Sequence, residues 1–159
     1  MPSPARLRLA LYEPDIAANT GTILRLAACL DVGVDVIEPC GFVWSEPKLR
    51  RAGMDYLDRV DLVRHASWAR FREAPALGRL VLLSTKAAVR LPDFRFEHGD
   101  TLLLGRESAG VPDAVRDVAD AAVRVPMAAG ERSLNVALAA ALVLGEALRQ
   151  LDAYPEDPR

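Results

Sequence analysis

Short apolar runs alternate with segments of helical periodicity along this chain of 159 residues. Apolar runs bounded by polar or turn-forming residues predict β-strands. They cover residues 7–12, 32–37, 60–64, 80–84, 101–104 and 122–125. Apolar residues three or four positions apart predict helices, which cover the segment opened by Asn19 and residues 48–54, 67–73 and 133–151. The alternation predicts an α/β fold, with a mainly parallel sheet and helices on both faces.

Two of the predicted helices are long. In the first, which Asn19 opens, Ile23 and Ala27 lie on one apolar face. The last, over residues 133–151, is apolar nearly all round, so we expect it to be buried on several sides. Because the sequence has no internal repeat, linker or break in composition, a single domain over residues 1–159 is expected.

Small and polar residues follow three of the predicted strands. Thr85 follows one strand, Gly105 ends another, and residues 126–132 follow the last. Because the carboxyl ends of parallel strands meet at one edge of a sheet, a ligand pocket is expected there. Gly105 either lets backbone approach the ligand or is a turn glycine at a strand end. The first strand is not followed by G-x-G-x-x-G, and the chain has no Walker lysine motif, which disfavours dinucleotide and P-loop sites.

Charge is distributed unevenly along the chain. The net charge of -2 and the pI near 5.7 argue against nucleic-acid binding by bulk electrostatics alone. Residues 48–72 nevertheless carry seven basic against three acidic side chains, a local charge of +4 that leaves -6 for the remainder. This segment is therefore either a phosphate-facing patch or a solvated surface of mixed charge.

The opening residues and the cysteines bear on location and redox state. A short apolar run near the start is ended by Glu13, Pro14 and Asp15, far short of a signal-peptide core or a membrane span. A cytoplasmic protein without a membrane segment is therefore expected. Cys29 and Cys40 lack metal-ligand spacing, and Cys29 is predicted on the apolar face of the first long helix. We expect both to be unpaired, reduced thiols, and we expect no bound metal.

Six dispersed blocks, in this order, resemble those of a known family. They are LYEPDIAANTGTILRLAA, IEPCGFVW, KLRRAGMDYLD, STK, LLLGRESAGVP and RSLNVALAAALVLGEALRQL. The chain resembles, over almost its whole length, the SPOUT class of S-adenosylmethionine-dependent RNA methyltransferases. It is most similar to the small bacterial enzymes that methylate the wobble ribose, cytidine or uridine, of tRNA. The resemblance implies a C-terminal trefoil knot, S-adenosyl-L-methionine as cofactor, a tRNA anticodon stem-loop as substrate, and a homodimer with the site near the subunit boundary.

Arg25 is the catalytic candidate that the resemblance implies. It matches the arginine that the resembling enzymes use at the reaction centre. A guanidinium is almost always protonated, so its expected role is to orient the RNA phosphate and the ribose hydroxyl and to stabilise developing negative charge. The alternative is an ion pair with an acid such as Glu13 or Asp15.

The resemblance also assigns the pocket. Expected cofactor contacts are Leu83, Gly105, Val125 and Ser133, followed by Thr85, Glu107, Met127 and Leu134. Expected substrate contacts are Asn19, Lys48, Arg50, Arg51 and Asn135. Ser133 is expected to be the N-cap of the last helix, and Asn135, one turn inside it, to bind loop backbone or substrate. Glu107 is expected to hold Arg25 or an RNA group, or to be a surface acid.

Three departures from the family pattern bear on substrate preference. Arg106, Ala137 and Gly145 stand where relatives often have proline, serine and tyrosine, which adds a charge near the substrate and removes two hydroxyls. Two other functions stay open at this point: the same chemistry on another tRNA or rRNA ribose, and a catalytically idle RNA-binding module.

Overall fold

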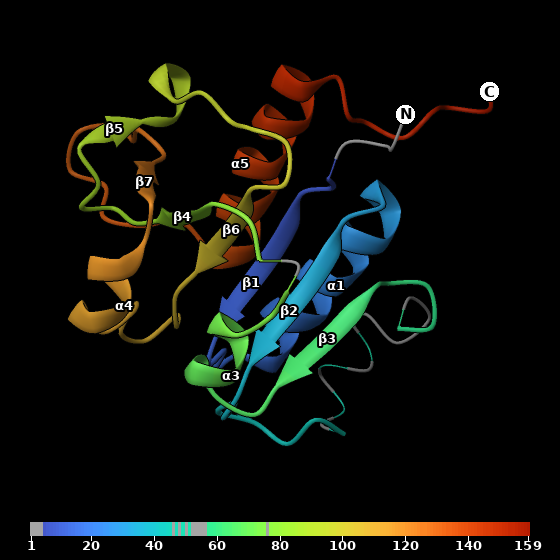
Figure 1. The fold of residues 1–159 in the computed structure, drawn as a ribbon. Coiled ribbons are helices and arrows are strands. Elements are labelled where there is room, and N and C mark those ends of the chain that lie inside the picture. Colours follow the sequence, from blue (N-terminus) through green and yellow to red (C-terminus); the bar gives the residue numbers. More distant parts are fainter. Residues whose placement is uncertain (1–4, 46, 48, 50, 52–56, 76) are drawn as a thin grey trace.

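The computed structural model describes residues 5–45, 47, 49, 51, 57–75 and 77–159, in which seven parallel strands form one sheet (Figure 1). The strand order is β3-β2-β1-β6-β4-β7-β5. The strands are β1 (Arg8–Tyr12), β2 (Gly33–Ile37), β3 (Leu62–His65), β4 (Leu80–Leu83), β5 (Val89–Arg90), β6 (Thr101–Leu104) and β7 (Ala121–Arg124). Every adjacent pair is parallel, which confirms the predicted sheet.

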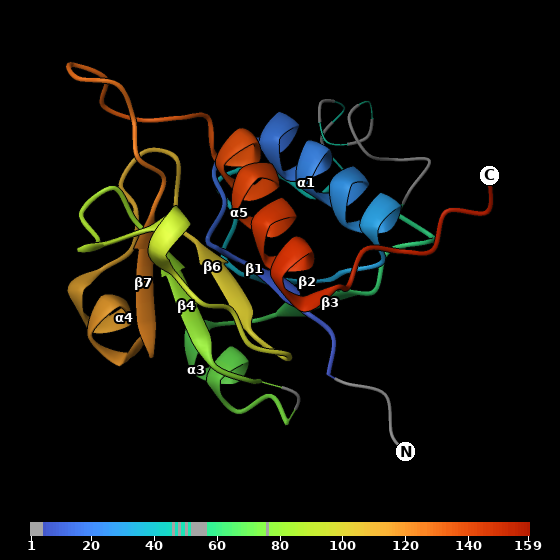
Figure 2. The ribbon, with the colours of Figure 1, turned by 90° about the horizontal axis from the view of Figure 1, so that it is seen from above.

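Helices cover both faces of this sheet (Figure 2). On one face, α1 (Ala17–Leu30) and α5 (Val136–Leu151) lie side by side. On the other face lie α3 (Trp68–Arg72) and α4 (Asp113–Val118). A short 3-10 helix, Leu91–Asp93, follows β5. The α/β prediction is confirmed, whereas the C-terminal trefoil knot stays a prediction.

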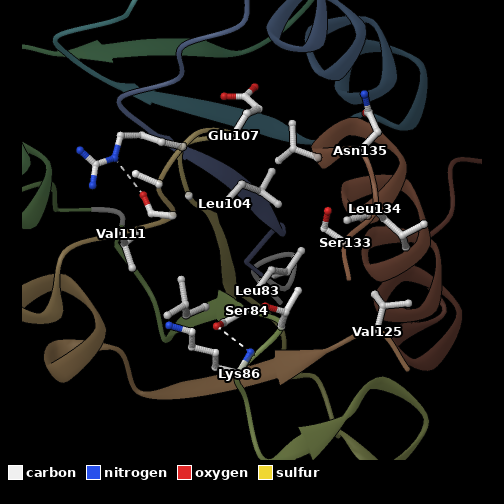
Figure 3. A pocket seen from close by; sticks show the side chains of 18 of the residues that line it. Leu83, Ser84, Lys86, Leu104, Glu107, Val111, Val125, Ser133, Leu134 and Asn135 are labelled. Carbon is white, nitrogen blue, oxygen red and sulfur yellow. Dashed lines mark hydrogen bonds between the residues drawn. The ribbon is translucent and has the colours of Figure 1, made fainter. Parts of the chain in front are cut away.

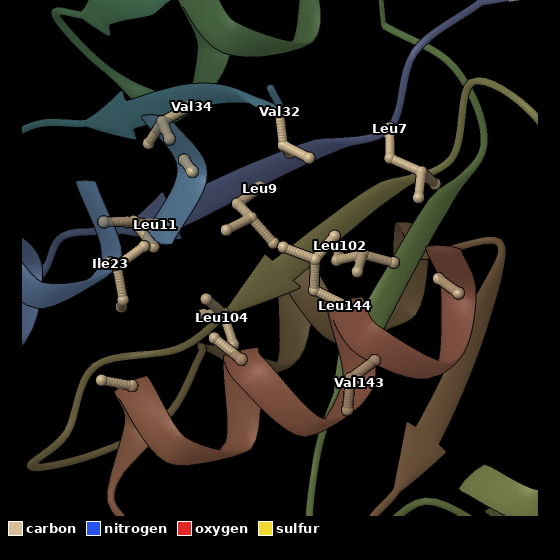
Figure 4. Packing of buried hydrophobic residues seen from close by; sticks show 14 of the residues in the cluster. Leu7, Leu9, Leu11, Ile23, Val32, Val34, Leu102, Leu104, Val143 and Leu144 are labelled. Atoms are coloured by element: carbon tan, nitrogen blue, oxygen red, sulfur yellow. The ribbon is translucent and has the colours of Figure 1, made fainter. Parts of the chain in front are cut away.

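Alternation along each strand builds two apolar cores. Leu9 and Leu11 of β1 point toward α1 and α5, whereas Ala10 and Tyr12 belong to the core beneath α3 and α4. Figure 4 shows the first core, in which Leu102 of β6 lies against Leu144 of α5, and Leu11 of β1 lies beside Ile23 of α1. Central parallel strands are buried on both faces, which explains why they are continuous apolar runs in the sequence.

Three short elements among the described residues escaped prediction: β5, the 3-10 helix at Leu91–Asp93, and α4. The six predicted strands are all present, with ends shifted by at most two residues. The polar segment between β4 and β6 also contains β5, whose two residues are exposed and pair with Val123 and Arg124 of β7. The six-residue helix α4 has only Val115 buried. Elements this short contain too few apolar residues for a hydrophobic period to be recognised.

Both long helices begin at residues other than those predicted. Helix α1 begins at Ala17, and its N-cap, Ile16, makes no side-chain capping bond. Asn19 therefore lies in the first turn and does not open the helix. Helix α5 begins at Val136, and its N-cap is Asn135 rather than Ser133. The Asn135 Oδ1 accepts hydrogen bonds from the N–H groups of the second and third helical residues, which is the standard capping geometry.

Within the single chain, the predicted burial of α5 holds for its inner side, and its outer side is exposed. Its inner side packs in the first core, but Leu138 and Leu142 are 59% and 50% exposed. These leucines are one turn apart, so they form an apolar stripe on the outer side of the helix. The predicted helix over residues 48–54 lies largely outside the described residues. No helix among the described residues is long and apolar enough to cross a membrane.

The two cysteines are free thiols in different surroundings. Cys29 is exposed, so its predicted place on the apolar face of α1 is wrong. Cys40 is partly buried, and this burial, with the nearby Glu38 carboxylate, raises the pKa of its thiol to about 11. At pH 8 a thiol with that pKa is ionised in about one molecule per thousand.

Iodoacetamide is therefore expected to alkylate Cys29 much faster than Cys40 in the folded protein at pH 8, because the thiolate is the reactive form. Peptide mass spectrometry over a time course measures the two rates. In guanidinium chloride the two cysteines should react at similar rates. Equal rates in the folded protein would contradict the burial of Cys40.

Candidate active site

A cavity of about 540 Å³ lies beyond the carboxyl ends of β4, β6 and β7. Its apolar wall includes Leu83 and Leu104, the last residues of β4 and β6, together with Val125 just after β7 (Figure 3). Its polar wall includes Ser133 and Asn135 from the loop before α5. The volume lies within the range of roughly 300–1,000 Å³ that is usual for small-molecule sites.

Most of the site residues predicted from the sequence meet in this cavity. All eight expected cofactor residues line it: Leu83, Thr85, Gly105, Glu107, Val125, Met127, Ser133 and Leu134. Two expected substrate residues, Asn19 and Asn135, line it as well. Arg25 is exposed on α1 and does not line the cavity, and neither does the exposed Arg51. Lys48 and Arg50 lie outside the described residues.

Gly105 begins a tight loop that closes on itself at Gly110. The N–H of Arg106 donates to the Gly110 carbonyl at 3.0 Å, and the N–H of Gly110 donates back to the Arg106 carbonyl at 2.9 Å. A Cβ at position 105 would lie 2.8 Å from the Gly110 Cα. The need for glycine at position 105 is therefore explained by close contact within the loop, whereas the ligand approach expected from the sequence is not needed to explain it.

Asp15 and Glu107 join the loop after β1 to the loop after β6. Asp15 Oδ1 accepts from the Glu107 N–H at 3.0 Å, and Oδ2 accepts from the Ser108 hydroxyl. The N–H of Asp15 donates to Glu107 Oε2 at 3.2 Å. The sequence does not predict this contact, and the ion pair with Arg25 is the one role that it suggests for Asp15.

The contact shifts the pKa values of Asp15 and Glu107 in opposite directions. Hydrogen bonding from the Glu107 side chain, followed by that from the Ser108 hydroxyl, lowers the pKa of Asp15 to about 2. Burial, followed by the contact with Asp15, raises the pKa of Glu107. The charge therefore stays on Asp15, which accepts donors on both oxygens, and a proton is retained more readily on Glu107.

Two asparagines join the N-terminal ends of α1 and α5. Asn135 Nδ2 donates to Asn19 Oδ1 at 3.0 Å, across 116 residues of sequence. Because Asn135 Oδ1 also caps α5, this one side chain positions both helix ends at the cavity. Asn135 therefore caps α5 and also binds Asn19 of α1. The sequence had instead predicted Asn135 one turn inside the helix.

Three cations at the cavity were not predicted as site residues. Lys86, Arg106 and Arg116 all line it. The Arg106 Nε donates to the Gly110 carbonyl at 2.9 Å, and its guanidinium carbon lies 5.5 Å from the ring centre of Tyr12. The sequence marked Arg106 as a departure from the family, which is the one signal that pointed to it. The described residues contain no group of three or more metal-ligating side chains.

Comparison with known proteins shows similarity over almost the whole chain. Residues 6–145 match the model of the SpoU rRNA Methylase family. A tRNA (cytidine(34)-2'-O)-methyltransferase from Beijerinckia indica is 59% identical over 147 residues, which are 91% of this chain and 92% of that protein. The protein of that name from Escherichia coli K12 is 40% identical over 151 residues, which are 94% and 96% of the two chains.

Solved structures are similar in fold as well. One, described as "Structural insights into the 2-OH methylation of C/U34 on tRNA", has a TM-score of 0.88 and 42% identity, and covers 94% of this chain and 99% of its own. The SpoU methyltransferase AviRb from Streptomyces viridochromogenes, in complex with the cofactor AdoMet, has a TM-score of 0.81 and 31% identity, and covers 95% and 62%. The chain therefore belongs to the SpoU rRNA methylase family.

Proposed function

We propose that this chain, acting as one methyltransferase domain, transfers the methyl group of S-adenosylmethionine to the ribose 2′-hydroxyl of the wobble cytidine or uridine of tRNA. The observation that carries the proposal is the meeting of ten expected site residues, from four distant segments, in one cavity. Relatives named for this reaction at nucleotide 34 support the same substrate.

The cavity residues fit S-adenosylmethionine. Leu83, Val125 and Leu134 offer apolar surface for a flat adenine, and the loop backbone around Gly105 offers N–H and C=O groups for its polar edge. Ser133 and Glu107 offer polar groups for the amino-acid end. When bound, the cofactor supplies an electrophilic methyl group on sulfur. A relative solved with AdoMet supports this assignment.

Arg25 is proposed to act on the RNA rather than on the cofactor. It lies six residues beyond Asn19 on α1, which is about 9 Å along the helix axis. RNA laid over the exposed side of α1 would place a phosphate at Arg25 and a ribose at the cavity mouth. Catalysis then consists largely of holding a poor nucleophile in line with the methyl group and stabilising the charge that develops on its oxygen.

Exposed basic residues on the β3 side are proposed to bind the rest of the tRNA. Arg64 lies 4.5 Å from the ring centre of Trp44, and Arg72 lies 5.8 Å from that of Trp68. Arg64 also donates from Nε and from one Nη to the Glu38 carboxylate, so its other Nη is the group proposed for phosphate, together with the guanidinium of Arg72. With Arg51, and with Lys48 and Arg50 of the same basic segment, they would extend the contact beyond the anticodon loop.

A homodimer with its site near the subunit boundary is proposed as the active form. The stripe of Leu138 and Leu142 continues toward the cavity through Leu134 and Ile16, which are 37% and 44% exposed and line it. Covering this apolar stripe with a second copy would remove it from water and close one side of the site. Action on tRNA would place the protein in the cytoplasm.

The test is methylation of defined RNA. The purified protein is incubated with methyl-labelled S-adenosylmethionine and unmodified tRNA, and the product is digested and mapped by mass spectrometry. We expect one 2′-O-methyl group, at nucleotide 34. A matched tRNA with a 2′-deoxy nucleotide at that position should take up no label. Label at another ribose, or on rRNA alone, would contradict the proposed substrate, and binding without any methylation would leave only an RNA-binding role.

A further inference from the structure

Asp15 has no place in the proposed chemistry, yet it joins two loops at the cavity by three hydrogen bonds. Its carboxylate accepts from the Glu107 N–H and from the Ser108 hydroxyl, while its own N–H donates to the Glu107 carboxyl group. The partners are more than ninety residues apart in sequence. Asp15 itself does not line the cavity, whereas Glu107 does.

Close packing fixes Asp15 from its other side. The N–H of Gly41 donates to the Pro14 carbonyl at 2.9 Å, and a Cβ at position 41 would lie 2.7 Å from the Asp15 Cβ. The loop after β2 thus holds Asp15 against the loop after β6. Because the link is anchored on this side, it can restrain the 105–110 loop, most of whose residues line the cavity.

We propose that Asp15 is a positioning residue, whose carboxylate holds the 105–110 loop, and Glu107 with it, in the conformation that receives S-adenosylmethionine. This inference rests on the proposed use of the cavity. Without the carboxylate, the loop would keep its turn at Gly105 and Gly110 but lose its tie to the loop after β1. If the receptive conformation is then present in one molecule of ten, the apparent Kd for the cofactor rises about tenfold.

The effect should fall on cofactor binding and not on chemistry. A bound cofactor selects the receptive loop, so saturating S-adenosylmethionine restores the enzyme that acts on RNA. For Asp15→Ala we expect the Kd and the KM for S-adenosylmethionine to rise at least tenfold, with kcat at saturation within about threefold of the parent. A purely structural role would instead lower the amount of folded protein and leave the KM of the folded fraction unchanged.

Three variants complete the test. Asp15→Asn keeps an oxygen for the Glu107 N–H and an amide that can donate to the Ser108 oxygen, so it should bind the cofactor within threefold of the parent. Ser108→Ala removes one hydrogen bond at an exposed position, where unfolding is not at issue, and should weaken binding two- to fivefold. Asp93→Ala, which removes an exposed aspartate paired with Arg90 away from the cavity, should change nothing.

Isothermal titration calorimetry with S-adenosylmethionine gives Kd, and methylation kinetics at varied cofactor give KM and kcat. Parent-like binding by both Asp15→Ala and Ser108→Ala would overturn the inference, and so would equal loss in Asp15→Ala and Asp15→Asn. If the unaltered protein does not bind S-adenosylmethionine, the proposed function itself fails, which is a separate result.

Discussion

Replacing Arg25 by alanine is expected to lower the rate of methyl transfer about a thousandfold while leaving cofactor affinity unchanged. Positioned cationic or hydrogen-bonding groups at a reaction centre are typically worth a factor of about 10²–10³ in kcat. Arg25 does not line the cavity, so S-adenosylmethionine should bind as before. Single-turnover methylation of tRNA measures the first quantity and calorimetric titration the second.

Lysine at position 25 is the matched variant. It keeps the positive charge but loses the planar fork of donors that can bind phosphate and hydroxyl together. We expect Arg25→Lys to recover less than a tenth of the parent rate. Full activity in Arg25→Ala would refute the assigned role. A parallel loss of cofactor binding would show that Arg25 acts on the cavity and not on the RNA.

Replacing Leu138 and Leu142 together by glutamate is expected to convert a dimer into an inactive monomer. The two side chains are half or more exposed and one turn apart on α5. In a subunit interface, four carboxylates would meet across the symmetry axis and would have to leave water without partners. Light scattering after size-exclusion chromatography measures the mass, and tRNA methylation measures the activity.

Val89 provides the control for this experiment. It is an apolar residue on β5 with 40% exposure, away from the α5 stripe, so Val89→Glu should keep both mass and activity. The leucines face outward, and their replacement should leave the thermal unfolding of the monomer nearly unchanged. A glutamate variant that remains dimeric would exclude the α5 stripe as the interface.

The strands of the sheet could be predicted because burial on both faces requires a run of apolar residues, which is visible within each strand's own sequence. Parallel strands covered on both faces are largely apolar, and β1 and β6 each show an unbroken apolar run after one polar first residue. Helix starts were misplaced because a capping side chain was inferred from the residue type alone. Whether Asn135 or Ser133 caps α5 depends on which backbone stands outside the helical conformation, and a short polar sequence does not reveal that.

Some residues of the candidate site could be predicted from the sequence, and others could not. Parallel topology predicted that Thr85 and Gly105 approach one another, and family resemblance supplied Ser133 and Asn135. Contacts across loops had no such signal. Asp15 binds Glu107 and Ser108 through ordinary polar atoms, and the pairing arises only once β1 and β6 lie side by side.

The position of β1 in the middle of the sheet also bears on how the protein is made. Its neighbour β6 begins at Thr101, and the cavity is closed by the loop that precedes α5. A nascent chain therefore holds its first strand without one of its two partners until most of the sequence has left the ribosome. Pairing over such separations is slow, and it exposes apolar strand edges in the meantime. Cofactor-binding capacity and the completed core should consequently arise together, late in synthesis.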